Sequence, residues 1–285
     1  MTMTDTLEPI DVGASHMTAR RGHGLYKSLF NVTREEVQSY DWDWYKDEHG
    51  SSANFDRLSH CSIFTHVKRA LIQKGHNVQF EGHATYSKHK AWQGVVTFLP
   101  QNPRAFTSSK VLMDYTPTVL ITNDYDGRTP FMLKVGAVIH DTGALVFDDR
   151  RLGAQKHTKH KLVDRMDEVA KQAVDEATAY LIHQEKRFET YRSVMLGLDE
   201  TYKVLMGAHD APDRCKKSAP VEGLKHLRGR PLDGPPWSMW DIMQSYTSAL
   251  LGRPSFSTYM RYTDGLITFL DRAAGFDREF RFEQS

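Results

Sequence analysis

Four aspartates and one histidine follow segments that predict strands, and together they could bind a divalent metal ion. A metal-dependent hydrolase needs two or three converging carboxylates that bind Mg²⁺ and activate a water molecule. Aspartate is also favoured in turns, because its side chain bonds to the backbone two residues on. No acid-x-Lys pair follows at the spacing of a nuclease, so turn residues are the favoured interpretation and a hydrolase stays as an alternative. The five residues are Asp124, Asp126, His140, Asp141 and Asp149.

The fourteen histidines do not form a recognisable metal motif. His60 and His66 are six positions apart on a predicted helix, which places them about 240° apart around its axis. No Cys/His quartet of a zinc site is present. The chain also lacks GxxxxGK[ST], GxGxxG after a strand, HExxH, GxSxG and CxxC. The sequence therefore predicts no catalytic residues, no bound metal and no cofactor, and it favours a protein that is not an enzyme.

Basic residues gather in three segments of a chain that is almost neutral overall. Lys plus Arg is 37 and Asp plus Glu is 36. Cations dominate residues 60–112, 150–161 and 214–230, whereas acids dominate residues 31–58. A charged run is usually a solvated face, but local cations are also what releases counterions from nucleic-acid phosphates. A strongly basic protein is excluded, so any nucleic-acid surface must come from this clustering.

Aromatic residues flank the basic tip of a predicted hairpin at Ser87–Lys90. Bases stack on aromatic rings while Lys and Arg contact phosphates, so this combination suits single-stranded nucleic acid. Tyr86 and Trp92 both fall on the apolar face of the hairpin, so core packing is the alternative for these two rings. The candidate nucleic-acid-binding residues are Tyr86, Lys88, Lys90, Trp92, Arg150, Arg151, Lys156, His157 and Lys159.

Hydrophobic periodicity predicts the elements that position these residues. Residues 59–74 have apolar side chains at four-residue steps and predict a helix that ends at Gly75. Thr33 precedes Glu35 and Glu36 and predicts a capping box at a helix start. Alternation of apolar and polar residues predicts two antiparallel hairpins, at 77–99 and 118–147, with about five strands in all. In the first hairpin, the apolar positions are the even ones from Val78 to Tyr86 and from Trp92 to Phe98.

The period changes to that of a helix from Leu162 to about Met206, with a break expected near Gly197. We therefore predict an α+β fold, in which an antiparallel β-sheet (hairpins 77–99 and 118–147) packs on a long helix and a helical C-terminal subdomain follows. The predicted organisation is a mobile N-terminal arm at 1–18, an α+β core domain at 19–207, a Pro-rich linker at 208–236 and the helical subdomain at 237–285.

Composition also bears on the compartment. Two cysteines, Cys61 and Cys215, are too few for a disulfide scaffold. No apolar run reaches the ~18 residues that cross a bilayer, and the first residues lack the apolar core of a signal peptide. We expect a protein of the cytoplasm without membrane contact.

Four short motifs occur in a fixed order that spans roughly residues 20–275. They are Gly22-His23-Gly24-Leu25, Leu120-Ile121-Thr122-Asn123-Asp124-Tyr125-Asp126-Gly127, Lys156-His157-Thr158 and Trp240-Asp241. This order resembles a phage- and plasmid-like protein family known as a domain of unknown function. Where that family commonly has Cys-x-Asn before the long helix, this chain has Ile139-His140-Asp141. The resemblance implies a phage, prophage or plasmid origin and action in the host-cell cytoplasm.

Three functions follow from these observations. The predicted order of helix, hairpins and long helix is similar to that of phage single-strand annealing proteins, which is an analogy of topology. The first hypothesis is a phage- or plasmid-encoded protein that binds or anneals single-stranded DNA in recombination or replication. The sequence leaves open whether the ligand is DNA or RNA and whether the protein forms a homo-oligomer. The others are a host-takeover or counter-defence protein that binds a bacterial protein, through the acidic residues 31–58, and the metal-dependent hydrolase.

Overall fold

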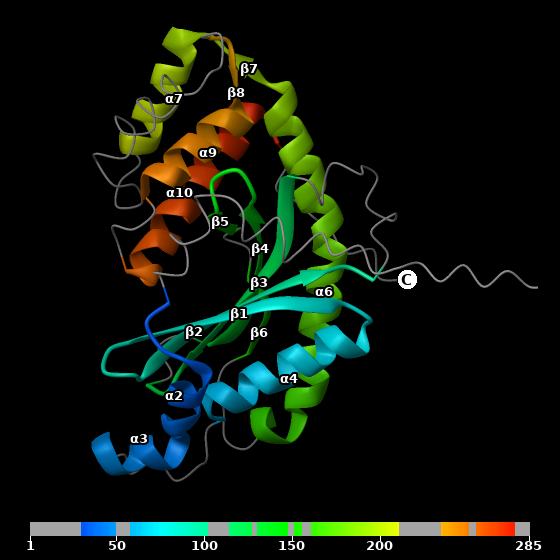
Figure 1. The fold of residues 1–285 in the computed structure, drawn as a ribbon, viewed down its shortest axis with the longest axis vertical. Coiled ribbons are helices and arrows are strands. Elements are labelled where there is room, and N and C mark those ends of the chain that lie inside the picture. The colour runs from blue at the N-terminus through cyan, green and yellow to red at the C-terminus, as the bar shows by residue number, and fades with distance from the viewer. Residues whose placement is uncertain are drawn as a thin grey trace, which may run out of the picture.

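Helices and strands follow one another in the order that the periodicities predicted (Figure 1). The computed structural model describes residues 30–49, 58–101, 114–126, 130–147, 151–155, 161–210, 235–250 and 255–276. The predicted arm at 1–18 and most of the predicted linker lie outside these ranges. The elements are α2 (Arg34–Ser39), α3 (Trp42–His49), α4 (His60–Gln73), β1 (Asn77–Tyr86), β2 (Ala91–Leu99), β3 (Tyr115–Asp124), β4 (Phe131–Ile139), β5 (Ala144–Phe147), β6 (Leu152–Gln155), α6 (Lys161–Ser193), β7 (Met195–Leu196), α7 (Leu198–Asp210), β8 (Trp237–Ser238), α9 (Met239–Leu250) and α10 (Phe256–Ala274).

Local hydrogen bonds begin and end the early helices, as predicted for Thr33 and Gly75 and not predicted for Ser59. The Glu36 N–H donates to Thr33 Oγ1 at 3.2 Å, and the Thr33 N–H donates to Glu36 Oε2 at 2.6 Å, which completes the capping box of α2. Ser59 caps α4 by accepting from the Ser62 N–H. Gly75 follows α4 with a φ of 84°, a left-handed conformation that glycine adopts without strain.

A six-stranded antiparallel sheet forms the centre of the fold. Strands β1 to β5 lie side by side in chain order, so each connection joins neighbours. Strand β6, which the sequence analysis did not predict, pairs with β4 as well. It lies beside the first residues of β4, whereas β5 lies beside the last ones. Strand β1 is at the edge, where Val32 forms an isolated bridge with His83.

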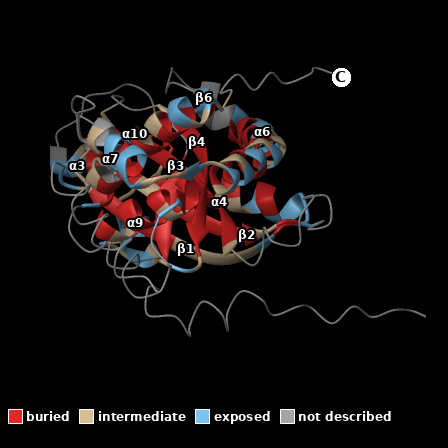
Figure 2. Ribbon diagram, turned by 90° about the horizontal axis from the view of Figure 1, so that it is seen from above, coloured by how far each residue is buried: buried red, intermediate tan, exposed pale blue. Residues whose placement is uncertain are grey.

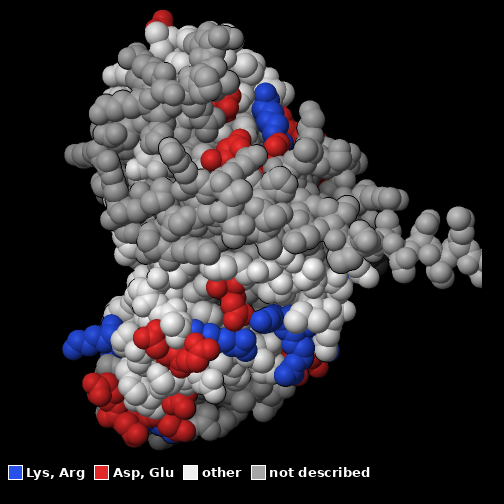
Figure 3. Space-filling view, in the orientation of Figure 1, with Lys and Arg blue, Asp and Glu red and all other residues white. Residues whose placement is uncertain are grey.

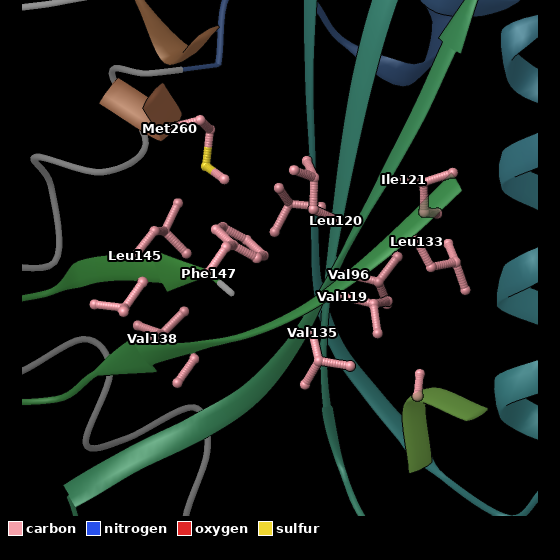
Figure 4. Close-up of a cluster of buried hydrophobic side chains, with 14 of the residues drawn as sticks. Val96, Val119, Leu120, Ile121, Leu133, Val135, Val138, Leu145, Phe147 and Met260 are labelled. Atoms are coloured by element: carbon pink, nitrogen blue, oxygen red, sulfur yellow. The ribbon is translucent and has the colours of Figure 1, made fainter. Parts of the chain in front are cut away.

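Helices cover both faces of the sheet. On one face Asn123 of β3 is within 2.9 Å of His60 on α4, and Tyr115 of β3 packs on Phe188 of α6. On the other face Lys134 of β4 donates to Asp264 on α10 at 2.5 Å, and α9 packs beside α10. Figure 4 shows the two sides: Leu120, Leu145 and Phe147 lie toward Met260, and Val96, Val119, Ile121 and Leu133 lie opposite. Buried residues therefore fill the strands themselves (Figure 2), and all nine residues of β4 are buried.

The register of the first hairpin places its two apolar stripes on opposite faces. A four-residue turn pairs the last residue of β1 with the first of β2, so even positions of β1 share a face with odd positions of β2. Trp92 and Phe98 therefore face α4 and α6, whereas Phe80 and Tyr86 face the other side. A bulge between Val78 and Phe80 moves Val78 to the α4 side. The prediction of one apolar face for this hairpin was wrong, because alternation within each strand does not determine the register between them.

One hydrophobic core runs through the fold. The stripe predicted for the long helix is buried, and it consists of Met166, Ala170, Ala173, Ala177 and Leu181. The helix breaks near Gly197 as predicted, where β7 pairs with β8. Residues from Ile63 on α4 to Leu270 on α10 belong to a single cluster of buried side chains. The helices assigned to a C-terminal subdomain thus share the core of the sheet.

Candidate nucleic-acid interface

Several chain segments meet at one end of the sheet, which we call the tip end. Ala91, directly after the β1–β2 turn, pairs with Asp124 at the end of β3. Phe131, at the start of β4, pairs with Gln155 at the end of β6. Strands β2 and β6 are three strand spacings apart, which is about 14 Å. The register therefore brings the hairpin tip and the last residue of β6 to the same end of the sheet.

The β1–β2 turn has a strained backbone. Ser87, Lys88 and His89 have φ angles of 52°, 56° and 63°, although none is glycine. Left-handed backbone disfavours an L residue by about 1–2 kcal/mol, and it persists where the surroundings over-determine it. His89 provides that constraint, because its Nδ1 is 2.8 Å from Thr85 Oγ1 and its carbonyl oxygen is 3.2 Å from His60 Nε2. The turn presents Lys88, which is exposed and has no ion-pair or hydrogen-bond partner within the described residues.

Three partly exposed rings pack together beside this turn, and we call Tyr40, Trp44 and His89 the tip trio. The Tyr40 and His89 rings stack with centroids 3.9 Å apart and an interplanar angle of 13°. Trp44 meets them edge-on, at 5.0 Å from Tyr40 and 6.1 Å from His89. Sequence analysis missed Tyr40 and Trp44, which it treated only as part of an acidic segment. The available signal was a run of four aromatic residues within 40–45.

A buried cluster supports the tip trio from below. Trp42, Tyr45 and Tyr125 pack together, and the Trp44 indole packs against them. The Tyr125 hydroxyl donates to the carbonyl oxygen of Tyr40 at 2.8 Å and accepts from a backbone N–H of α4 at 3.1 Å. Burial raises the pKa of Tyr125, so its hydroxyl stays protonated and can donate. The tip trio is therefore held by bonded and packed neighbours.

The two aromatic candidates from the sequence are not at the surface of the tip. Trp92 is 1% exposed and lies in the core, where its indole covers Gly94. A base cannot stack on this ring in this conformation. Trp92 instead packs in the core, which was the alternative role considered for it. Tyr86 is half-buried on the opposite face of the sheet, and its hydroxyl donates to Gln93 Oε1 at 2.8 Å.

Three of the basic candidates belong to the described residues. Lys88 is exposed on the turn. Lys90 lies 3.6 Å from Asp126 and 5.7 Å from the centroid of the Tyr45 ring, so an acid offsets its charge. Arg151 is exposed immediately before β6. The other four candidates, Arg150, Lys156, His157 and Lys159, lie outside the described residues.

Acidic side chains balance the described cations around the tip. Lys46 on α3 is 2.7 Å from Asp43, much as Lys90 is paired with Asp126. Asp47 and Glu48 on α3 are exposed, and acidic atoms gather at that corner of the molecule (Figure 3). Phosphate attraction within the described part of the tip end therefore depends mainly on Lys88.

The candidate metal ligands lie at opposite ends of the sheet. Asp124 and Asp126 are at the tip end, and His140 and Asp141 follow β4 at the far end, where β4 pairs with the start of β3. Strand β3 has ten residues, which span about 30 Å. The Asp126 N–H donates to Asp124 Oδ1 at 2.7 Å, as in a turn. These four residues therefore do not converge on one site, which weighs against the hydrolase alternative and agrees with the favoured interpretation as turn residues; Asp149 lies outside the described ranges.

The described ranges hold neither a metal-ligand cluster nor a membrane-spanning helix. No group of three or more His, Cys, Asp and Glu side chains there is arranged to hold a metal ion. None of the helices found there is long and apolar enough to span a bilayer.

A ladder of stacked rings runs inward from the tip, formed by Tyr125, His60, Trp92 and His83. Successive ring centroids are 4.1, 5.6 and 5.9 Å apart. His83 is 3% exposed, and neither of its ring nitrogens has a hydrogen-bond partner among the described residues. Burial lowers the pKa of His83 to about 4, so the imidazole is neutral at pH 7. This ring ladder connects the tip trio to the edge strand.

The chain has no recognised relatives in the comparisons with known proteins. No family model matches it, no curated protein matches it, and no solved structure matches it.

Proposed function

We propose that the protein binds single-stranded nucleic acid at the tip end of its sheet. The observation that carries the proposal is the strand register, which brings the basic turn with Lys88 to the same end as Gln155. In the sequence, Gln155 is followed by Lys156 and Lys159, which lie outside the described residues. Lys88 on the turn, together with the lysines that follow Gln155 in the sequence, suits contact with the phosphates of a single strand.

The proposal extends to biology through the motif order. The resemblance to a phage- and plasmid-like family supports an origin on a phage or plasmid and action in the host-cell cytoplasm. Binding or annealing of single strands in recombination or replication is the matching role, and a homo-oligomer would extend the site along a longer strand. Such a role needs no catalytic group, in line with the lack of catalytic motifs in the sequence.

A salt-dependent titration tests the proposal. Labelled single-stranded DNA and RNA of about 20 nucleotides are titrated with the full chain from ~50 mM salt upward. Lys88→Glu should weaken binding several-fold and make the salt dependence shallower, because each lost phosphate contact removes about 0.7 from the slope. Lys203→Glu is the matched control, since Lys203 is exposed on α7, at the opposite end of the molecule in Figure 1. Absence of binding at ~50 mM salt, or equal losses in both variants, would contradict the proposal.

A second candidate is the binding of a basic partner protein through α3. It is favoured by one observation, the exposed acids Asp47 and Glu48 beside the partly exposed Trp44. The double variant Asp47→Lys/Glu48→Lys separates the two candidates. If nucleic acid is the ligand, removing nearby negative charge raises the affinity for the oligonucleotide. If a basic protein is the ligand, the parent chain does not bind the oligonucleotide at all.

A further inference from the structure

We infer that the tip trio of Tyr40, Trp44 and His89 is a stacking site for unpaired bases. The ligand is then recognised by its bases more than by its phosphates, and a duplex, whose bases are stacked on one another, is excluded. This inference rests on the proposed function and specifies which part of the nucleic acid the tip end binds.

The first argument is the nature and exposure of the rings. All three are partly exposed, next to a lysine that has no described partner. Every nucleobase has a flat π-face, so stacking on Tyr, Trp or His tolerates any sequence. The Tyr40–His89 pair already has the 3.9 Å centroid separation and near-parallel planes of a stack, which a base can extend.

The second argument is that the rings are held in place before any ligand arrives. The Tyr125 hydroxyl bonds to the backbone carbonyl of Tyr40, whose ring stacks on His89, and Thr85 Oγ1 lies 2.8 Å from the His89 ring. The third ring, that of Trp44, packs on buried aromatic neighbours. Because little side-chain freedom is left to lose, stacking on these rings costs less conformational entropy than stacking on free side chains.

The third argument is electrostatic. Lys46 and Lys90 are both paired with aspartates, at 2.7 and 3.6 Å, which leaves Lys88 as the described tip lysine without an acidic partner. A surface with so few uncompensated cations makes few phosphate contacts. Within the described part of the tip, affinity must then come mainly from stacking, so contacts to the tip trio should add little to the salt dependence.

Three labelled oligomers of equal length test this inference on the full chain: oligothymidylate, an abasic strand with the same phosphates, and a duplex. The abasic strand and the duplex should bind at least about tenfold more weakly than oligothymidylate at the same salt concentration. Equal affinity for oligothymidylate and the abasic strand would overturn the stacking inference and leave the proposed function standing. If none of the three binds, the proposed function fails too.

A pair of variants assigns the effect to one ring. Tyr40→Ala should lose between about fivefold and about a hundredfold in affinity for oligothymidylate and leave the abasic strand unaffected. Tyr40→Phe keeps the ring and should bind as the parent does, because the Tyr40 hydroxyl has no hydrogen bond within the described residues. Equal binding by the Ala and Phe variants would overturn the assignment to Tyr40. Should the Ala variant not fold, the comparison of oligomers on the parent chain still decides the inference.

Discussion

Arg187 and Asp271 join α6 to α10 in a buried polar cluster, whereas the tip trio joins α2 and α3 to the β1–β2 turn at the surface. In the α6–α10 cluster, Arg187 Nε donates to Asp271 Oδ1 at 3.0 Å, and the two side chains are 2% and 0% exposed. Tyr191 donates to the same carboxylate oxygen at 2.6 Å, and Arg187 Nη2 donates to the Tyr180 hydroxyl at 3.2 Å. The tip trio leaves its rings partly exposed and lies beside a left-handed backbone.

The two regions use similar residue types for different purposes. In the α6–α10 cluster, the charges are buried and bonded to one another, so the cluster specifies how two helices pack. At the tip, backbone strain is retained and Lys88 has no described partner, and strain of this kind is often kept at binding sites. We therefore expect substitutions in the first region to lower stability strongly, and substitutions at the tip to change stability little and, under the proposed function, to change binding.

The largest effect is expected in the α6–α10 cluster. Asp271→Ala leaves the Arg187 guanidinium buried without its carboxylate, and the free energy of unfolding should fall by about 3–5 kcal/mol. Replacing both partners, as Arg187→Met with Asp271→Leu, should recover most of this loss because neither member of the ion pair is then left buried without the other. Urea unfolding of the parent, the single variant and the double variant measures these free energies. A single variant as stable as the parent would show that the cluster does not hold the helices together.

A smaller effect is expected at the inner end of the ring ladder, where His83 is buried without a described partner. An unfolded histidine has a pKa of about 6.5, whereas folding lowers the pKa of His83 to about 4. Between these values the unfolded chain binds a proton that the folded chain does not. The free energy of unfolding should therefore fall as the pH drops from about 6.5 to about 4, by roughly 3 kcal/mol from this group.

The variant His83→Phe isolates that contribution. It removes the titrating group and keeps a ring between Phe64 and Trp92, so acidification should destabilise it less than the parent by the same roughly 3 kcal/mol. The measurement compares how the free energy of unfolding changes with pH in the two chains, because the substitution also changes stability at any single pH. Parallel pH profiles for the two chains would mean that His83 does not stay neutral in the fold.

The smallest effect on stability, with the opposite sign, is expected at the tip. Lys88→Gly relieves one left-handed residue and should raise the free energy of unfolding by about 0.5–1 kcal/mol after the entropy of glycine is included. The same change removes the exposed cation and should weaken oligonucleotide binding. Ser87→Gly relieves similar strain without removing a charge, so it should stabilise the protein and leave binding intact. A loss of stability in both glycine variants would contradict the assignment of strain to this turn.

Much of the fold could be predicted because the buried face of a helix or strand appears as a regular spacing of apolar residues within that segment. The capping residue Thr33 bonds to a backbone group three positions on, so its role follows from neighbouring residues. Ser59, which the prediction included in the helix, is its N-cap instead. Alternation located β1 to β5, and the change of period located α6 with its break near Gly197. The short strand β6 has four residues, which is too few for a period to stand out.

The candidate site could be predicted only in part, because it depends on contacts between distant residues. Lys88 and Lys90 were placed on the turn by local alternation, and that placement is confirmed. The stack of Tyr40 on His89 joins residues 49 positions apart, and no local pattern pairs them.

Sequence alone thus determined which segments are helices and strands, since period and capping depend on residues within a turn of one another. Tertiary structure decided which face each strand presents, because a turn of four residues and one bulge set the register that sends Trp92 into the core. It also decided that the aspartates at the two ends of β3 and β4 stay about 30 Å apart, and that the aromatic residues before α4 close over the hairpin turn. These outcomes depend on packing energies between elements, which a one-dimensional pattern does not contain.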